Sequence, residues 1–148
     1  MLPLAVQLGT RVTARPRDDG VLSCTSTLGS AAPSEVPLTS LSPRHRGWSS
    51  YVEGCAWVLA DAGVGLPGAD VLVDGDLPVG AGLSSSASLV CATLSGLLDL
   101  AGEAWDPQEV ATAARRVENA YVGAPVGAMD QLAVMHGRDG HALFVDDP

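Results

Sequence analysis

The sequence contains no lysine, and its eight arginines are outnumbered by 17 acidic residues, which gives a formal net charge of −9. A Walker A phosphate loop needs Gly-Lys-Ser or Gly-Lys-Thr, so the absence of lysine excludes that motif. The acidic balance argues against nucleic acid and against an anionic membrane as partners, because both carry negative charge. The same charge does not argue against a small anionic ligand such as a nucleotide, which local dipoles can hold.

Cysteine is scarce, with only Cys24, Cys55 and Cys91, and no two of them form a C-x-x-C pair. The odd number and wide spacing exclude a disulfide framework and a cysteine zinc site, so we expect buried, reduced thiols. The three histidines lack the spacing of a zinc-binding helix. No apolar run is long enough to cross a membrane, and no basic segment precedes an apolar stretch at the start, so we expect a cytoplasmic protein.

The most distinctive stretch is a short glycine- and serine-rich run between two apolar segments. Residues 69–76 alternate as a strand does, and apolar residues recur at helical spacing over 89–101. Between them, Gly80 and Gly82 allow the backbone to approach a ligand, and Ser84 or Ser85 is predicted to cap the helix. Free N–H groups at a helix start form an anion site. The alternative, a flexible linker, fits poorly between two strongly patterned segments.

The rest of the chain is long enough for one domain, and 47% of its residues are hydrophobic. Residues 1–17 predict a strand, a turn near Gly9 and a second strand; 18–20 predict a hairpin turn, and 21–26 a short strand. Residues 30–43 predict a surface loop, and 48–62 a helix. A third helix is predicted to start at Asp106, followed by a turn over 121–127 and a strand over 141–146.

Two motifs resemble a known family. Residues 78–88 read P-V-G-A-G-L-S-S-S-A-S, similar to the nucleotide loop of the GHMP small-molecule kinases, and the Leu-Ser-Ser-Ser version is similar to galactokinases in particular. Further on, Glu118-Asn119, Val122-Gly123 and Gly127-Ala128-Met129-Asp130-Gln131 are similar to the galactokinase pattern E-N-x-x-V-G…G-x-M-D-Q. The two motifs also have the separation found in that family.

The resemblance implies an α+β fold, in which a mixed β-sheet is packed with helices in a ribosomal-protein-like arrangement. Residues 1–148 would form an incomplete GHMP kinase N-terminal domain, with no second domain. The family's opening motif, similar to G-R-x-N-L-I-G-E-H-T-D-Y, is missing, which we interpret as a truncated start or a fragment. We expect this chain alone to be inactive and poorly soluble, because the missing parts would leave sheet edge and apolar surface exposed.

The resemblance also assigns site residues. It implies that the nucleotide phosphates of ATP bind the loop formed by Gly80, Ala81, Gly82, Leu83, Ser84, Ser85 and Ser86. It implies that Ser86 and Glu118 hold Mg²⁺, that Asp130 is the catalytic base, and that Asp130 and Gly127 contact the sugar. Without the motif, Glu118 would be interpreted as a solvated carboxylate on an amphipathic helix, and Asp130 as a turn or cap aspartate.

The activity implied is that of a galactokinase, which transfers a phosphoryl group from ATP to the anomeric hydroxyl of α-D-galactose. The full-length protein would be a monomer. A related sugar 1-kinase, acting on N-acetylgalactosamine or arabinose, stays open because the sugar-contacting opening motif is missing. A non-catalytic sensor of galactose and ATP is a third hypothesis, although such a sensor has no need to keep Asp130.

Overall fold

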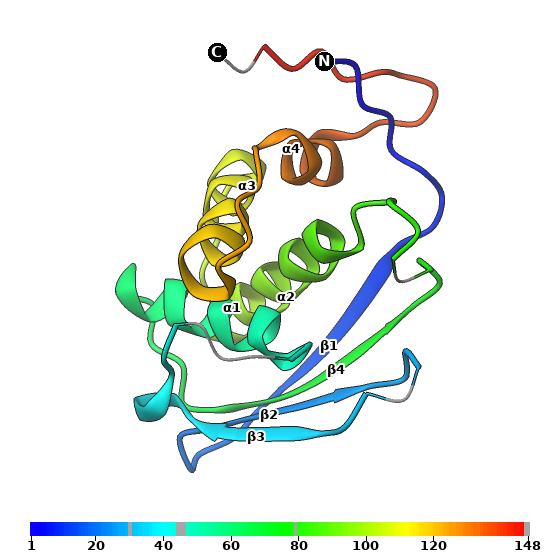
Figure 1. Ribbon diagram of the computed structural model, residues 1–148. Coiled ribbons are helices and arrows are strands. Elements are labelled where there is room, and N and C mark those ends of the chain that lie inside the picture. The colour runs from blue at the N-terminus through cyan, green and yellow to red at the C-terminus, as the bar shows by residue number, and fades with distance from the viewer. Residues whose placement is uncertain (30, 44–46, 79, 147–148) are drawn as a thin grey trace.

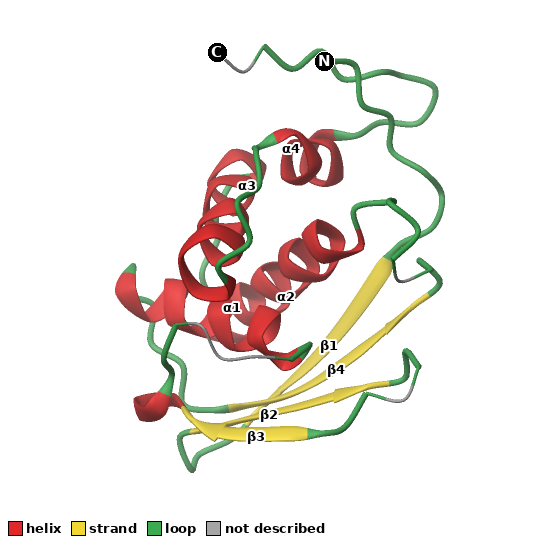
Figure 2. Cartoon of the chain, in the orientation of Figure 1, coloured by secondary structure: helices red, strands yellow, loops and turns green. Residues whose placement is uncertain are grey.

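The computed structural model describes residues 1–29, 31–43, 47–78 and 80–146, and shows one sheet with all of its helices on one side (Figure 1, Figure 2). Ser30, at the start of the predicted loop, lies outside the described residues. The predicted α+β class and mixed sheet are confirmed. No helix in the described ranges is long and apolar enough to cross a bilayer.

The sheet has four strands in the spatial order β1-β4-β2-β3. β4 (Ala69–Gly75) lies between β1 (Thr10–Pro16) and β2 (Val21–Ser26), antiparallel to the former and parallel to the latter. β3 (Ser34–Pro37) pairs with β2 in the antiparallel sense and forms the other edge. The sheet is therefore mixed, with the strand that leads into the glycine–serine loop near its centre.

The helices form two layers over one face of this sheet (Figure 1). α1 and α2 lie against the strands, while α3 and α4 pack on α2 farther from the sheet (Figure 2). A short 3₁₀ turn follows β3, and a π-helical segment continues α3. The bounds are Leu38–Ser40 for η1, Ser49–Asp61 for α1, Ser85–Ala101 for α2, Pro107–Arg116 for α3, Val117–Val122 for η2 and Met129–His136 for α4.

The core lies between the sheet and the first helix layer. In β4, Val71 and Val73 are fully buried while Leu72 faces the open side, which confirms the predicted alternation. The apolar stripe of α2 is buried as its spacing predicts, with Leu94 and Leu97 inaccessible to solvent. Burial of this stripe fixes the direction of α2 over the sheet, and so fixes where its first turn lies.

Two local features explain the helix positions around the core. Asp106 and Glu109 form a reciprocal capping box at the start of α3, as the sequence predicts. Gly54 allows α1 to approach η2 closely, because a Cβ there would lie 2.8 Å from Val117 Cγ1 and 3.0 Å from Tyr121 Cδ1. A larger residue at this position would therefore have to displace these two side chains.

Two predictions about the N-terminal half are wrong. The turn over 18–20 does not form a hairpin, because β4 inserts between β1 and β2 and takes the hydrogen bonds of both. The predicted loop over 30–43 contains β3 and η1, since Val36 pairs with Leu22 and the edge of the sheet supplies partners that its own sequence does not signal.

The strands predicted at the two ends are also wrong. Residues 1–9 and 141–146 form no regular strand and meet only in one antiparallel bridge, between Leu4 and Ala142. Met1 and Val145 additionally donate a backbone hydrogen bond to each other, and the carbonyl of Pro3 accepts one from the N–H of Leu143. The two terminal segments thus pair with each other rather than joining the sheet (Figure 1). Of the apolar residues in 1–9 and 141–146, Val145 is buried, while most of the others are exposed.

Candidate active site

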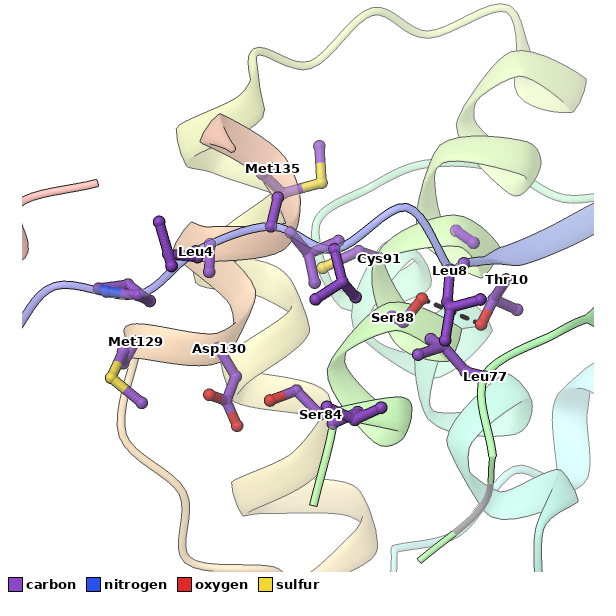
Figure 3. Close-up of a pocket in the computed structure, with 18 of the residues that line it drawn as sticks. Leu4, Leu8, Thr10, Leu77, Ser84, Ser88, Cys91, Met129, Asp130 and Met135 are labelled. Carbon is purple, nitrogen blue, oxygen red and sulfur yellow. Dashed lines mark hydrogen bonds between the residues drawn. The ribbon is translucent and has the colours of Figure 1, made fainter. Parts of the chain in front are cut away.

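A cavity of about 530 Å³ opens between the N-terminal segment, the start of α2 and α4 (Figure 3). Its apolar wall comes mainly from the N-terminal segment and α4, and its polar side chains are Thr10, Ser84, Ser88, Ser95 and Asp130. The lining is Pro3, Leu4, Ala5, Val6, Leu8, Gly9, Thr10, Leu77, Gly82, Leu83, Ser84, Ser88, Cys91, Ala92, Ser95, Met129, Asp130, Ala133, Val134 and Met135.

The glycine–serine loop reaches this cavity through a backbone that only glycine adopts readily. Gly80 has φ +78° and Gly82 has φ +72°, both in the left-handed region. A Cβ at either position would meet no atom within 4 Å. The glycines are thus needed for the backbone turn, and they leave open space beside the loop where a ligand can approach.

Ser84 occupies the N-cap position of α2, but the predicted cap hydrogen bond is wrong. Its φ of +54° is left-handed, and it is the one non-glycine residue with positive φ in the described ranges. An N-cap side chain needs an extended backbone to reach the first-turn N–H groups, so Ser84 makes no such bond. Ser85 lies inside the helix and does not cap it either.

Because the cap is missing, no side chain of the described residues accepts a hydrogen bond from the first-turn N–H groups of α2. The N–H of Ser88 bonds the carbonyl of Ser84, whereas the N–H groups before it have no helical acceptor. The positive end of the helix dipole adds to their attraction for an anion. A helix start with free N–H groups, and with a strained residue in place of a cap, is suited to bind a phosphate group.

The floor of the cavity is held by one hydrogen bond between distant segments. The hydroxyl of Ser88 donates to Oγ1 of Thr10 at 3.0 Å, which ties α2 to the start of β1 (Figure 3). Next to it, burial and the Glu118 charge raise the pKa of Cys91 to about 12. The Cys91 thiol therefore stays protonated, and it contributes packing rather than a nucleophile.

Asp130 lies in the first turn of α4 and is half-buried at the edge of the cavity. In Figure 3 the hydroxyl of Ser84 points toward its carboxylate, so a serine of the loop and an acidic side chain from a helix 46 positions later face one cavity. A carboxylate opposite an anion site is suited to accept a proton from a group placed between them.

Glu118 is buried, with 1% of its surface exposed, so its interpretation as a solvated carboxylate is wrong. It lies at the second position of η2 and accepts a hydrogen bond from Nε2 of Gln131. Within the described ranges no basic side chain forms an ion pair with it. The pKa of Cys55 is raised by burial and, to a smaller degree, by this carboxylate.

The predicted site residues are only partly brought together. Gly82, Leu83, Ser84 and Asp130 line the cavity. The lining does not include Gly80, Ala81, Ser85, Ser86, Glu118 or Gly127. Among the described residues no group of three or more His, Cys, Asp and Glu side chains is arranged to hold a metal ion.

Two contacts of the site lack a local sequence signal. Ser88 and Thr10 are 78 positions apart, and no pattern near either residue predicts their hydrogen bond. Gln131 belongs to the second motif, but sequence reasoning assigned it no role, although it bonds Glu118. Because Gln131 lies 13 positions from Glu118, no local pattern in the sequence predicts this contact.

Comparison with known proteins identifies the family. The model of the GHMP kinases N terminal domain matches residues 50–138. The chain belongs to the GHMP kinase family. This match includes both sequence motifs, the whole of α2 and α4, and the π-helical segment that carries Glu118.

Curated relatives within the GHMP kinase family are galactokinases. The chain is 37% identical over 145 residues to a galactokinase of Mycobacterium tuberculosis, covering 98% of this chain and 40% of that protein. It is 40% identical over 147 residues to a galactokinase of Streptomyces coelicolor, covering 99% of this chain and 38% of that protein. The chain thus spans about 40% of the length of these relatives, and its resemblance to galactokinases is confirmed.

Solved structures give the same result. The crystal structure of Lactococcus lactis galactokinase complexed with galactose superposes with a TM-score of 0.86 at 31% identity, over 95% of this chain and 37% of that one. A mevalonate kinase of Methanococcus jannaschii reaches a TM-score of 0.74 at 14% identity, over 92% of this chain and 45% of that one, which shows the shared fold alone.

Proposed function

We propose that this chain is the N-terminal part of a galactokinase, which transfers the γ-phosphoryl group of ATP to the anomeric hydroxyl of α-D-galactose. The observation that carries the proposal is the half-buried carboxylate of Asp130 facing the same cavity as the uncapped start of α2. The similarity to galactokinases over nearly the whole chain supports the choice of substrate.

The phosphates of ATP are assigned to the loop from Gly80 to Ser86 and the first turn of α2. The support is chemical, because glycines at positive φ and free helical N–H groups together form an anion site without lysine. Phosphoryl transfer leaves the protein mainly positioning and charge stabilisation to supply. A backbone site of this kind supplies both with little side-chain motion.

Asp130 is assigned the role of general base, and Gly127 that of a sugar contact. The Asp130 carboxylate would take the proton from the anomeric hydroxyl as that oxygen forms its bond to the γ-phosphorus, while the bond to the β-phosphate oxygen of ADP breaks. The products are galactose 1-phosphate and ADP, and the proton stays on the carboxylate until solvent removes it.

Ser86 and Glu118 are assigned to Mg²⁺, and their chemistry fits. A buried carboxylate with no basic partner among the described residues favours a nearby cation, because an isolated buried charge is costly. Mg²⁺ takes few protein oxygens and completes its shell with water and phosphate. When bound, it neutralises phosphate charge that develops during transfer.

The wider assignments follow from the same proposal. Residues 1–148 are assigned to an incomplete GHMP kinase N-terminal domain, and the complete protein to a cytoplasmic monomer that binds galactose and ATP. The requirement of the proposed reaction for ATP supports the assignment to the cytoplasm. The net charge of −9 supports the absence of nucleic acid and anionic membrane among the partners.

The test compares Asp130→Asn with Asp99→Asn in the complete gene product. We expect galactose-dependent ADP release from the unaltered protein and a loss of roughly 100-fold or more in Asp130→Asn, with ATP binding retained. Asp99 is exposed on α2, so Asp99→Asn is a matched acid-to-amide control with unchanged turnover.

Other outcomes distinguish the alternatives. A clear preference for N-acetylgalactosamine or arabinose in the same assay would reassign the sugar within the kinase class. Galactose and ATP binding without any turnover, unaffected by Asp130→Asn, would indicate a sensor and contradict the kinase proposal.

A further inference from the structure

Gln131 is a buried polar residue that the proposed reaction does not use. Its side chain is 1% exposed, as is that of Glu118, and its Nε2 donates a hydrogen bond to Oε2 of Glu118. Its carbonyl oxygen Oε1 is buried and has no hydrogen-bond partner in the described structure. The amide is thus satisfied on one side only, toward the glutamate.

The position of Gln131 on α4 connects two assigned residues. Asp130 and Gln131 are successive residues in the first turn of α4, so their side chains diverge by about 100° around the helix axis. One lies at the edge of the cavity and the other is buried against η2. A single helical turn therefore carries the proposed base and the partner of the proposed metal ligand.

The energetics argue against a purely structural role for this amide. A buried carbonyl without a partner is destabilising, whereas an apolar side chain of similar size would leave no unpaired acceptor. An amide N–H next to a carboxylate, by contrast, orients that carboxylate and leaves its other oxygen free. Groups that orient metal ligands in this way commonly determine metal affinity.

We propose that Gln131 is a positioning residue that orients the Glu118 carboxylate for Mg²⁺ through its amide N–H. The inference rests on the proposed function, because Glu118 must serve as a metal ligand. Gln131 contacts neither substrate in this assignment. It acts through Glu118. Because Gln131 directly follows Asp130 on α4, its hydrogen bond also holds the Glu118 carboxylate in a fixed position relative to Asp130.

The experiment measures Mg²⁺ dependence in the complete gene product with Gln131→Met, which keeps the side-chain size but removes the amide. We expect the Mg²⁺ concentration for half-maximal ATP binding in calorimetry to rise by about 10- to 100-fold. The KM for galactose should stay within about twofold, since the sugar contacts are untouched. Gln108→Met, at an exposed position of α3, is the matched control and should change neither value.

A charge swap separates orientation from mere packing. Glu118→Gln combined with Gln131→Glu keeps one amide and one carboxylate in the pair, so we expect a thermal midpoint close to that of the unaltered protein. In this variant the carboxylate lies on α4 instead of at position 118, so we expect ATP binding to lose its dependence on Mg²⁺. This variant also gives an answer if Gln131→Met does not fold.

The outcomes separate the two proposals. If ATP binding by the unaltered protein does not depend on Mg²⁺, the assigned metal site fails and the inference fails with it. If that dependence exists but Gln131→Met leaves it unchanged, only the role of Gln131 is overturned. A lower thermal midpoint of Gln131→Met with an unchanged Mg²⁺ requirement has the same meaning, since the residue then only packs α4 against η2. If the charge swap keeps the dependence, Glu118 is not the metal ligand, and the inference fails together with that assignment.

Discussion

The layer between the sheet and α1–α2 differs from the two terminal segments, although both are rich in apolar residues. In the layer, Leu22, Leu59 and Leu94 are completely buried. In the terminal segments, Leu2, Leu4, Val6 and Phe144 are exposed, with 73% of Phe144 accessible. The segments are joined to each other by a few backbone hydrogen bonds, and Val145 is the one apolar residue of 1–9 and 141–146 that is buried.

An apolar pattern in the sequence and the burial of those apolar side chains are therefore separate properties. Burial requires a surface that faces the pattern, and α1 and α2 supply it for one face of the sheet alone. The cavity with Asp130 lies at the boundary between these two regions, walled by α2 on one side and the N-terminal segment on the other. The polar half of the site is therefore built mainly on α2 and α4, while the apolar half combines α4 with the N-terminal segment.

The largest effect on stability is expected from the core. Leu94→Ala removes a fully buried side chain of α2, and we expect it to lower the free energy of unfolding by about 2–5 kcal/mol. Urea denaturation measures this change. The control is Leu72→Ala on the open face of the sheet, where 41% of the side chain is exposed and the loss should be much smaller. Equal losses of unfolding free energy in Leu94→Ala and Leu72→Ala would contradict the difference in burial between the core and the open face of the sheet.

A smaller effect is expected where α1 meets η2. Gly54→Ala places a methyl group against Val117 and Tyr121, which costs about 1–3 kcal/mol in overpacking. The gain in helix propensity offsets about 1 kcal/mol of it, so the net loss should be up to about 2 kcal/mol. Thermal unfolding tests this, with Gly65→Ala as a control, since a Cβ there meets no atom within 4 Å. Stabilisation by Gly54→Ala would show that η2 shifts freely away from α1.

The smallest effect is expected in the terminal region. Phe144→Ser in the 148-residue chain should change the free energy of unfolding by no more than about 0.5 kcal/mol, because its ring is already in water. The soluble fraction should rise, since an exposed aromatic ring is removed. A loss of 2 kcal/mol or more in denaturant titrations would mean that Phe144 is buried in solution, and would remove the contrast between the regions.

Local signals explain which elements were predicted correctly. Each correct prediction depends on residues that are close together in the sequence. These are the periodicity of α1 and α2, the alternation of β4 and the capping box of α3. The cap by Ser84 was wrong because the loop imposes a left-handed backbone on it. The roles of Asp130, Ser86 and Glu118 stay predictions, based on motif resemblance and on the chemistry of their surroundings.

Local sequence pattern accounts for α1, α2, α3, the central strand, the glycine turn and the family, because each is encoded in neighbouring residues or in a contiguous motif. The sequence did not predict α4 or the π-helical segment η2. The tertiary structure alone decided that β4 separates β1 from β2, that residues 34–37 form an edge strand, and that the terminal segments pair with each other. It also decided that Glu118 is buried against Gln131. These outcomes depend on which surfaces meet across the fold, and a partner many residues away leaves no mark on the local pattern.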